Sequence, residues 1–183
     1  ILLTEPRVVA YYLSLIVFPH PDRLNLDYRF PLSQGLFQPA TTFLSLILVL
    51  MLLITAIASA RSHRLRSFGI LWFLTTLAVE SSVIGLALIF EHRTYLPSIF
   101  LILLFNAFLF RHIRPRSLAL FMLLTIIIVN GYWTYSRNTV WTTKIELWQD
   151  CIAKSPQKAR PYNNLGVFYT ETGSPEKSLP YLR

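Results

Sequence analysis

Four polar residues that could do chemistry interrupt the longest apolar stretch of the chain: Glu80, Glu91, His92 and Arg93. An ionisable group inside a membrane-spanning run costs roughly 2.5 to 3.5 kcal/mol at the midplane on insertion scales. Glu80 therefore predicts a polar cavity or a partner beside it. Glu91 follows eleven residues later, close to three helical turns, so an unbroken helix would place both carboxylates on one face. These residues are the candidates for a polar pocket.

The same residues also permit a purely structural interpretation. Glu91 and Arg93 would then cap and anchor a turn, and Glu80 would be protonated or paired with a helix outside this chain. The sequence leaves both interpretations open. Tyr95, just beyond, is interpreted as an anchor at the membrane interface.

The remaining polar residues are weaker candidates. The loop over 19–39 is predicted to be aqueous or covered by protein. Its alternating acidic and basic residues could pair with one another or form part of a sugar site, and a solvated loop is the favoured interpretation. Its charged residues are Asp22, Arg23, Asp27 and Arg29. Three histidines, His20, His63 and His112, lack metal-ligand spacing, so no metal site is predicted. The single cysteine, Cys151, falls on the apolar face of a predicted helix and is a core position.

Composition indicates that much of the surface faces lipid. Hydrophobic residues make up 54% of the 183 residues and charged residues only 14%, which is too apolar for a soluble domain of this length. The net charge of +8 is concentrated in short arginine-rich segments between apolar runs, as in cytoplasmic loops. We therefore expect membrane lipid as a partner and no nucleic acid.

The apolar runs predict an all-α fold with about four spans. About 20 residues cross the roughly 30 Å hydrocarbon layer, and the runs near 40–60, 67–90, 97–110 and 117–136 are assigned as spans. Ahead of them, Glu5-Pro6-Arg7 interrupts the first apolar segment. The remainder, Val8 to Phe18, is too short to cross alone and is assigned as a short apolar helix that is interfacial, re-entrant or half of a span.

Charge predicts the orientation of these spans. Arg61 to Arg66 and Arg111 to Arg116 are short basic loops separated by two spans, so both lie on the cytoplasmic side. The loop over 19–39, the Glu91 turn and everything after Ser136 then lie on the periplasmic, or topologically equivalent, side. The sequence therefore predicts a multi-pass inner-membrane protein. Its transmembrane domain covers 1–136 and its periplasmic domain covers 137–183.

The carboxyl-terminal segment has the pattern of a tetratricopeptide repeat. Apolar residues recur at helical spacing over Lys144 to Lys154, and Pro156 ends that helix. A second helix carries an aromatic and small-residue signature, and the preceding Pro156 stands at the offset expected for the end of the previous repeat. Gly173 supplies the turn into a third helix. The signature residues are Pro156, Tyr162, Leu165, Gly166 and Tyr169. Any amphipathic helical hairpin remains an alternative.

Three motifs occur in a characteristic order. They are Glu80-Ser81-Ser82, the turn from Glu91 to Ser98 (EHRTYLPS), and the Leu147-Trp148 helix leading into Asn163-Asn164-Leu165-Gly166. With them the chain resembles bacterial membrane proteins with carboxyl-terminal tetratricopeptide repeats, relatives of the transmembrane and tetratricopeptide repeat O-mannosyltransferases. The resemblance covers most of the chain and is most specific in Glu91 to Ser98 and in the repeat.

The resemblance implies a glycosyltransferase, mannosyltransferase-like, that moves sugar from a polyprenyl-phosphate donor to a periplasmic protein or glycan recruited by the repeats. Arg93 and His92 would then bind the donor phosphate. Glu80 and Glu91 would line the pocket. Such enzymes generally carry the acceptor-activating acid in an external loop near the amino terminus, so no catalytic residue is assigned and we expect that part to precede Ile1.

A second class of function stays open. In it the protein is a non-enzymatic scaffold, in which the spans serve as an anchor and the repeats bind a protein partner. No cofactor other than the sugar donor is predicted, and the need for a divalent metal stays open.

Overall fold

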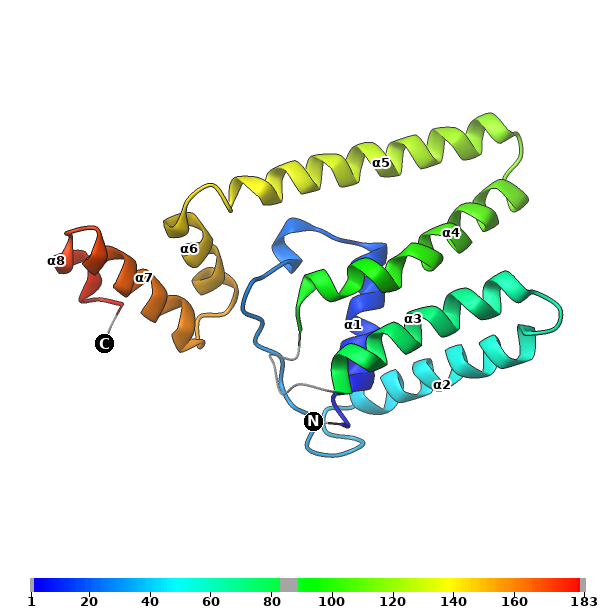
Figure 1. The fold of residues 1–183 in the computed structure, drawn as a ribbon, viewed down its shortest axis with the longest axis horizontal. Coiled ribbons are helices and arrows are strands. Elements are labelled where there is room, and N and C mark those ends of the chain that lie inside the picture. The colour runs from blue at the N-terminus through cyan, green and yellow to red at the C-terminus, as the bar shows by residue number, and fades with distance from the viewer. Residues whose placement is uncertain (1, 83–88, 182–183) are drawn as a thin grey trace. The chain divides into compact units, whose positions relative to one another are not determined.

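The computed structural model describes residues 2–82 and 89–181, apart from the side chains of 80–82 and 175. Within these ranges every regular element is a helix, as predicted (Figure 1). The elements are α1 (Glu5–Val17), η1 (Pro21–Arg23), α2 (Thr41–Ser59), α3 (Arg64–Ser82), η2 (Glu91–Thr94), α4 (Tyr95–His112), α5 (Arg116–Thr139), α6 (Lys144–Lys154), α7 (Ala159–Glu171) and α8 (Pro175–Ser178).

The helices form two compact units. Unit 1 comprises residues 1–18 and 31–126, and unit 2 comprises residues 19–30 and 127–183. The division falls within α5, and the connection between α1 and α2 contributes to both units. The predicted periplasmic domain, 137–183, lies within unit 2 together with residues 19–30, which are far from it in sequence.

Three helical segments of the described chain are long and apolar enough to span a membrane. They are Thr41–Ser59, Glu91–His112 and Arg116–Thr139. In an 18-residue apolar stretch of each segment, only 17, 11 and 6%, respectively, is buried inside the protein. These side chains therefore do not form a protein core. A helix that exposes apolar side chains nearly all round has lipid as its natural solvent, and the prediction of membrane association is supported.

The predicted span near 67–90 overlaps α3 and continues into residues 83–88, which lie outside the described ranges. The count of four spans therefore stays a prediction. Of the other three, the predicted spans near 97–110 and 117–136 are longer in the structure, as Glu91–His112 and Arg116–Thr139, whereas the span near 40–60 is slightly shorter, as Thr41–Ser59. The one near 97–110 begins before Pro97, which is tolerated in the first turn of α4 because the amide hydrogen that proline lacks has no partner there.

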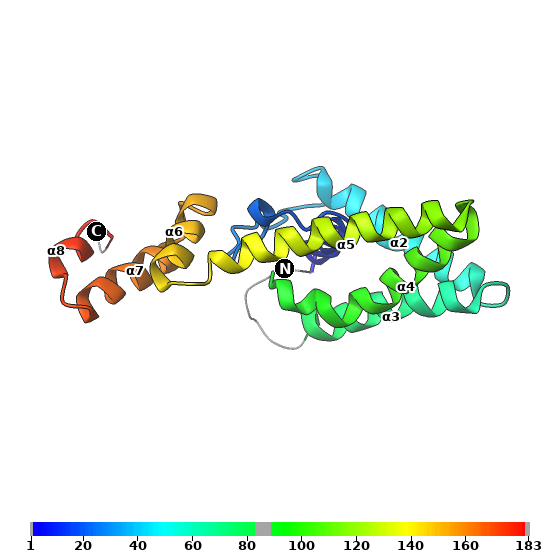
Figure 2. The ribbon, with the colours of Figure 1, turned by 90° about the horizontal axis from the view of Figure 1, so that it is seen from above.

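The short helix α1 runs across the other helices of unit 1. Figure 2 shows α1 end-on while α2 and α3 lie in the plane of the view. Glu5-Pro6-Arg7 interrupts the apolar run but not the helix, because these residues form the first turn of α1 with the proline at its start. Its buried face contains Val8, Tyr12 and Leu15, at the spacing of one helix face.

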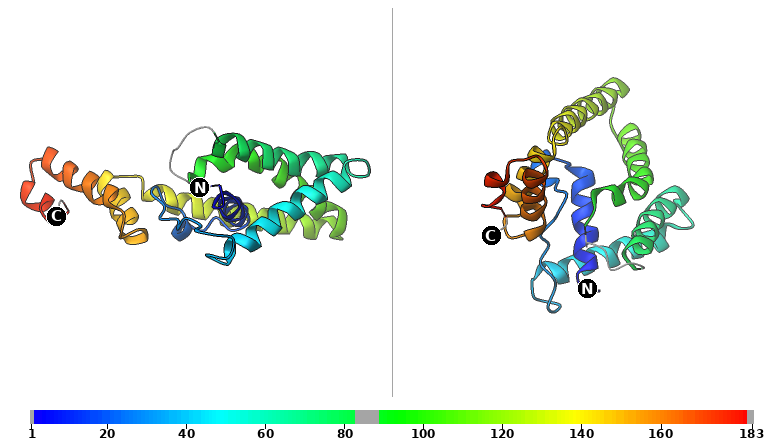
Figure 3. Two further views of the ribbon diagram at one scale, coloured as in Figure 1. Left: turned by 90° about the horizontal axis from the view of Figure 1, so that it is seen from below. Right: turned by 60° about the vertical axis from the view of Figure 1, so that its left-hand side comes forward.

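Close packing of α3 against α4 fixes the arrangement of the apolar helices. A Cβ placed on Gly69 would lie 2.7 Å from Leu104 Cδ1 and 3.4 Å from Phe100 Cβ, so a larger residue here would require the Leu104 side chain to shift. Trp72 Nε1 donates a hydrogen bond to the Leu96 carbonyl oxygen at 3.1 Å. The two helices run in opposite directions, and α2 pairs with α3 through the turn at Arg61 (Figure 3).

Unit 2 contains a packed series of short helices. Thr143 caps α6 by accepting a hydrogen bond from the Glu146 N–H. The chain leaves α7 through Gly173, whose φ of +76° is the left-handed conformation that glycine adopts at low cost. The Ser174 N–H donates to the Tyr169 carbonyl at 2.9 Å, the bond that defines a Schellman cap. Helix α8 ends at Ser178, before Pro180.

Candidate functional site at the start of α4

Three of the predicted site residues lie together on one turn. Glu91, His92 and Arg93 belong to η2, which leads directly into α4. The residue before them, Phe90, is extended, with φ −135° and ψ 128°. Thr94 Oγ1 donates to the Glu91 carbonyl oxygen at 2.7 Å and closes the turn. The local sequence therefore places two opposite charges and an imidazole within three consecutive positions at the start of an apolar helix.

The aromatic ring of Phe90 contacts two side chains of this turn. The Arg93 guanidinium carbon lies 5.1 Å from the ring centroid, within cation–π range. The His92 imidazole stacks on the same ring, with 5.2 Å between centroids. Glu91 and Arg93 are half-buried and His92 is exposed, so the turn presents one exposed imidazole beside two partly covered charges.

Helix α1 holds Phe90 in place. The Phe90 N–H donates to Tyr12 Oη at 3.0 Å, and the Tyr12 side chain is almost completely buried. Sequence reasoning missed Tyr12. The available signal in the sequence was the spacing of Thr4, Val8 and Tyr12, because residues four positions apart lie on one face of a helix. In the structure all three are buried.

Helix α1 is in turn anchored to the start of α2. Arg7 is buried and donates to the Pro31 carbonyl at 2.7 Å and to Ser33 Oγ at 3.3 Å. The Ser33 N–H donates to Thr4 Oγ1 at 3.0 Å, and Ser33 Oγ lies 2.8 Å from Thr42 Oγ1. These bonds satisfy the polar groups that α1 buries, and they make Arg7 and Tyr12 positioning residues for η2.

The fourth predicted site residue, Glu80, has its backbone on α3, while its side chain lies outside the described part of the structure. The aligned arrangement of Glu80 and Glu91 required one unbroken helix. Phe90 is extended and Glu91 lies on η2, so the two residues are not on one continuous helix.

The predicted repeat residues lie on and beside α7. Leu165 and Gly166 are buried, Tyr162 is half-buried, and the Tyr169 ring stacks on Tyr181 with 5.8 Å between centroids. Pro156 is exposed and follows the end of α6. Helices α6 and α7 pack on each other, which fits a helical hairpin. Their assignment to a tetratricopeptide repeat stays a prediction.

Unit 2 also contains a buried charge cluster that sequence reasoning missed. Arg137 Nη1 donates to Asp150 Oδ2 at 2.6 Å, and Lys154 Nζ lies 2.8 Å from Asp150 Oδ1. Arg137 is 6% exposed. Within the described residues its Nε and Nη2 atoms have no hydrogen-bond partner. The cluster joins α5 to α6, and Asp150 is the carboxylate that balances both cations.

The connection between α1 and α2 packs on α6. Lys154 Nζ donates to the carbonyl oxygens of Pro21 and Leu24 at 2.9 and 2.8 Å. Asn25 Nδ2 donates to Ser155 Oγ at 2.8 Å, and Lys158 pairs with Asp27 at 3.5 Å. The interpretation of this loop as solvated is therefore wrong for Asp27, which is buried.

Cys151 is buried, as the sequence predicted. Burial raises the pKa of its thiol, and hydrogen bonds from the Leu26 and Asp27 backbone oppose that rise only in part. A neutral buried thiol is a poor nucleophile, so Cys151 is a core residue.

No group of three histidine, cysteine, aspartate or glutamate side chains that could hold a metal ion is found over 2–82 and 89–181. Comparisons with protein-family models, with curated proteins and with solved structures find no match to this chain. The arguments for function therefore rest on the residues themselves.

Proposed function

We propose that this chain is part of a multi-spanning glycosyltransferase-like protein of the bacterial inner membrane. It transfers a sugar from a polyprenyl-phosphate donor to a protein or glycan on the periplasmic side. The observation that carries the proposal is the η2 turn, where Arg93, His92 and Glu91 adjoin an apolar helix and are held by Tyr12 through Phe90. The sequence resemblance supplies the reaction.

The chemistry of a lipid-linked donor matches this placement. Such a donor has a long apolar chain and a charged phosphate, so its site needs an apolar surface that ends at a cation. Helix α4 offers exposed Ile99 and Ile102 below the turn that carries Arg93. A guanidinium binds phosphate through two parallel hydrogen bonds. Glu91 would contact the acceptor or sugar hydroxyls, and His92 would assist at the phosphate.

The orientation belongs to the same proposal. The two arginine-rich turns face the cytoplasm under the positive-inside rule, and η2 precedes α4 whereas one of these turns follows it. One crossing by α4 therefore places η2 on the periplasmic side. A further crossing by α5 returns the chain to that side, so α6 and α7 would recruit the acceptor there.

Sugar transfer by the full-length protein in membranes tests the proposal. Wild type is compared with Arg93→Ala, Arg93→Lys and Glu80→Gln at matched expression, with Arg114→Ala as a control far from η2. We expect transfer to fall more than about tenfold in Arg93→Ala, since a charge-assisted phosphate contact is lost. Partial rescue in Arg93→Lys, seen as a raised donor KM, would place Arg93 at the phosphate.

A second candidate is the non-enzymatic scaffold, and the packed pair α6 and α7 favours it. Photo-crosslinkers at Asn163 and Val167, two exposed positions on α7, would then capture one defined protein partner. Wild-type protein that transfers no sugar from any polyprenyl-phosphate donor, yet gives such a crosslink, would replace the first proposal with this one.

A further inference from the structure

The two arginine-rich turns of unit 1 are both strongly charged. The turn between α2 and α3 contributes Arg61, Arg64 and Arg66, and the turn between α4 and α5 contributes Arg111, Arg114 and Arg116. All six side chains are exposed, and neither turn contains an acidic residue. Their charge is therefore not neutralised within the turns themselves.

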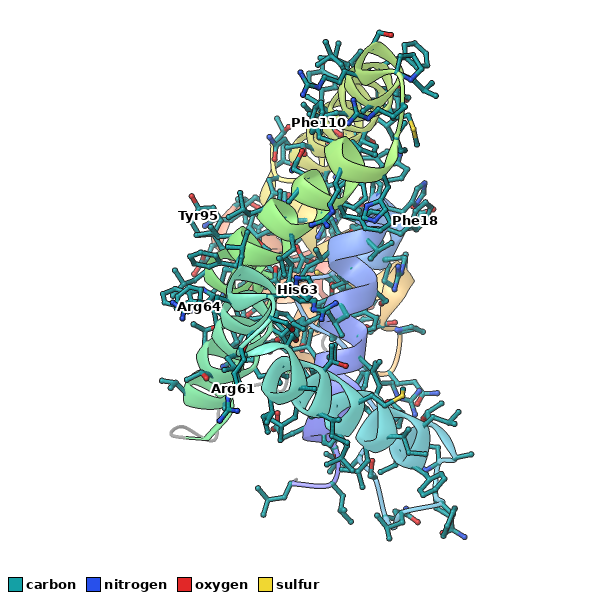
Figure 4. All side chains as sticks on the ribbon, turned by 90° about the vertical axis from the view of Figure 1, so that its right-hand side faces the viewer. Phe18, Arg61, His63, Arg64, Tyr95 and Phe110 are labelled. Atoms are coloured by element: carbon teal, nitrogen blue, oxygen red, sulfur yellow. The ribbon has the colours of Figure 1, made fainter. Side chains whose placement is uncertain are left out.

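The packing of unit 1 brings the two turns to the same end of its helices. The contact of Gly69 with Leu104 aligns α3 and α4 in opposite directions, so the start of α3 and the end of α4 lie at one end. Figure 1 shows both turns there. In Figure 4, Arg61, His63 and Arg64 surround the first turn, and Phe110 lies near the second.

Exposed apolar side chains adjoin both turns. Ile57 and Phe68 flank the first turn and are 64% and 49% exposed, and Phe108 and Phe121 flank the second and are 58% and 67% exposed. The change from lipid-facing to charged side chains thus occurs within about two helical turns. Guanidinium groups at the end of a membrane-spanning helix are at the right level to meet the phosphates of lipid headgroups.

We propose that these six arginines bind the phosphate headgroups of anionic phospholipids. This goes beyond orienting the spans, because it makes the anionic lipid a bound partner of the chain. A guanidinium can bind a lipid phosphate through two hydrogen bonds, and these six are exposed at the level where headgroups lie. A free phosphate ion would instead require cations that converge in a buried pocket, and the exposed arginines belong to two separate turns.

Spin-labelled lipids test this proposal on the full-length protein in symmetric bilayers, where the orientation of the protein does not affect the result. The measured quantity is the fraction of labelled phosphatidylglycerol held at the protein relative to labelled phosphatidylcholine. We expect wild type to favour phosphatidylglycerol at least about twofold, and salt to reduce the preference by screening.

Two triple variants and one control locate the effect. Arg61, Arg64 and Arg66 are changed to Gln in one variant, and Arg111, Arg114 and Arg116 in the other. The control removes the same charge from unit 2 by changing Lys144, Arg160 and Lys177 to Gln. We expect each arginine variant to lower the preference for phosphatidylglycerol and the control to retain it.

Three results would overturn the proposal. Equal association of both lipids with wild type would show that the turns do not select anionic headgroups. An equal loss in the unit 2 control would show that only net charge matters. Complete competition by inorganic phosphate at constant ionic strength would assign the arginines to a soluble anion. The experiment does not depend on sugar transfer, so its outcome is independent of the proposed function.

Discussion

Tyr12 and Phe90 are joined by a hydrogen bond of 3.0 Å across 78 positions of sequence. The Phe90 N–H is the donor, and the buried phenol oxygen is the acceptor. Phe90 also carries Arg93 and His92 on its ring. This bond therefore helps to link the first helix to the turn that holds the predicted phosphate-binding residues.

Removing the phenol oxygen tests that link. In Tyr12→Phe the partly buried Phe90 N–H loses its acceptor, and the cost is at or below the lower end of the roughly 1 to 3 kcal/mol of a fully buried unsatisfied donor. We expect faster amide hydrogen exchange over 89–94 and a lower melting temperature of the purified protein. Tyr95→Phe is the control, because Tyr95 is 80% exposed. Unchanged exchange in Tyr12→Phe would show that α1 does not hold η2.

Asp150 is expected to be the most sensitive acidic position in unit 2. Asp150→Asn removes the carboxylate that pairs with Arg137 and Lys154. Breaking a buried ion pair from one side costs about 3 to 5 kcal/mol, because the remaining cation stays buried. Thermal unfolding of unit 2 should shift downward, whereas Glu171→Gln on the exposed part of α7 should leave it unchanged. Equal shifts in both variants would contradict this account.

Cys151 should make the stability of unit 2 depend on alkaline pH. Burial raises the pKa of the folded thiol above its unfolded value. Stability is therefore complete below the unfolded pKa of about 8.5 and is lost as pH rises from there through the folded pKa. Melting temperatures between neutral and alkaline pH should fall more steeply in wild type than in Cys151→Ala. Rapid alkylation of Cys151 in the folded protein would refute its burial.

Single cysteines test the orientation of the membrane segment. In a Cys151→Ser background, His92→Cys and His63→Cys place exposed thiols at η2 and at the first arginine-rich turn. An impermeant maleimide added to intact spheroplasts should label position 92 and leave position 63 unlabelled until the membrane is opened. Labelling of position 63 from outside would reverse the proposed topology.

Local sequence patterns predicted the elements of this protein well. Apolar length alone indicated the runs that became α2, α4 and α5, and the proline and glycine positions indicated the limits of α6 and α7. These features depend on short-range physics, namely hydrophobic burial per helix and the conformational limits of proline and glycine. The position of Cys151 in the core followed from the same periodicity.

Long-range partners could not be read in this way. The bonds of Tyr12 with Phe90 and of Asn25 with Ser155 join residues 78 and 130 positions apart. Nothing in the residues near either partner specifies the other. The tyrosine was merely one more aromatic in an apolar run, and Asn25 was merely one more polar loop residue.

The attachment of residues 19–30 to α6 bears on how this protein can be divided for experiments. Lys154, Ser155 and Lys158 are all bonded to that segment. A recombinant fragment starting after α5 would keep these side chains and lose their partners, and it would also lose the Leu26 and Asp27 backbone that is hydrogen-bonded to Cys151. The carboxyl-terminal helices are therefore not an independent module, and a soluble fragment should carry the 19–30 peptide fused to it through a linker.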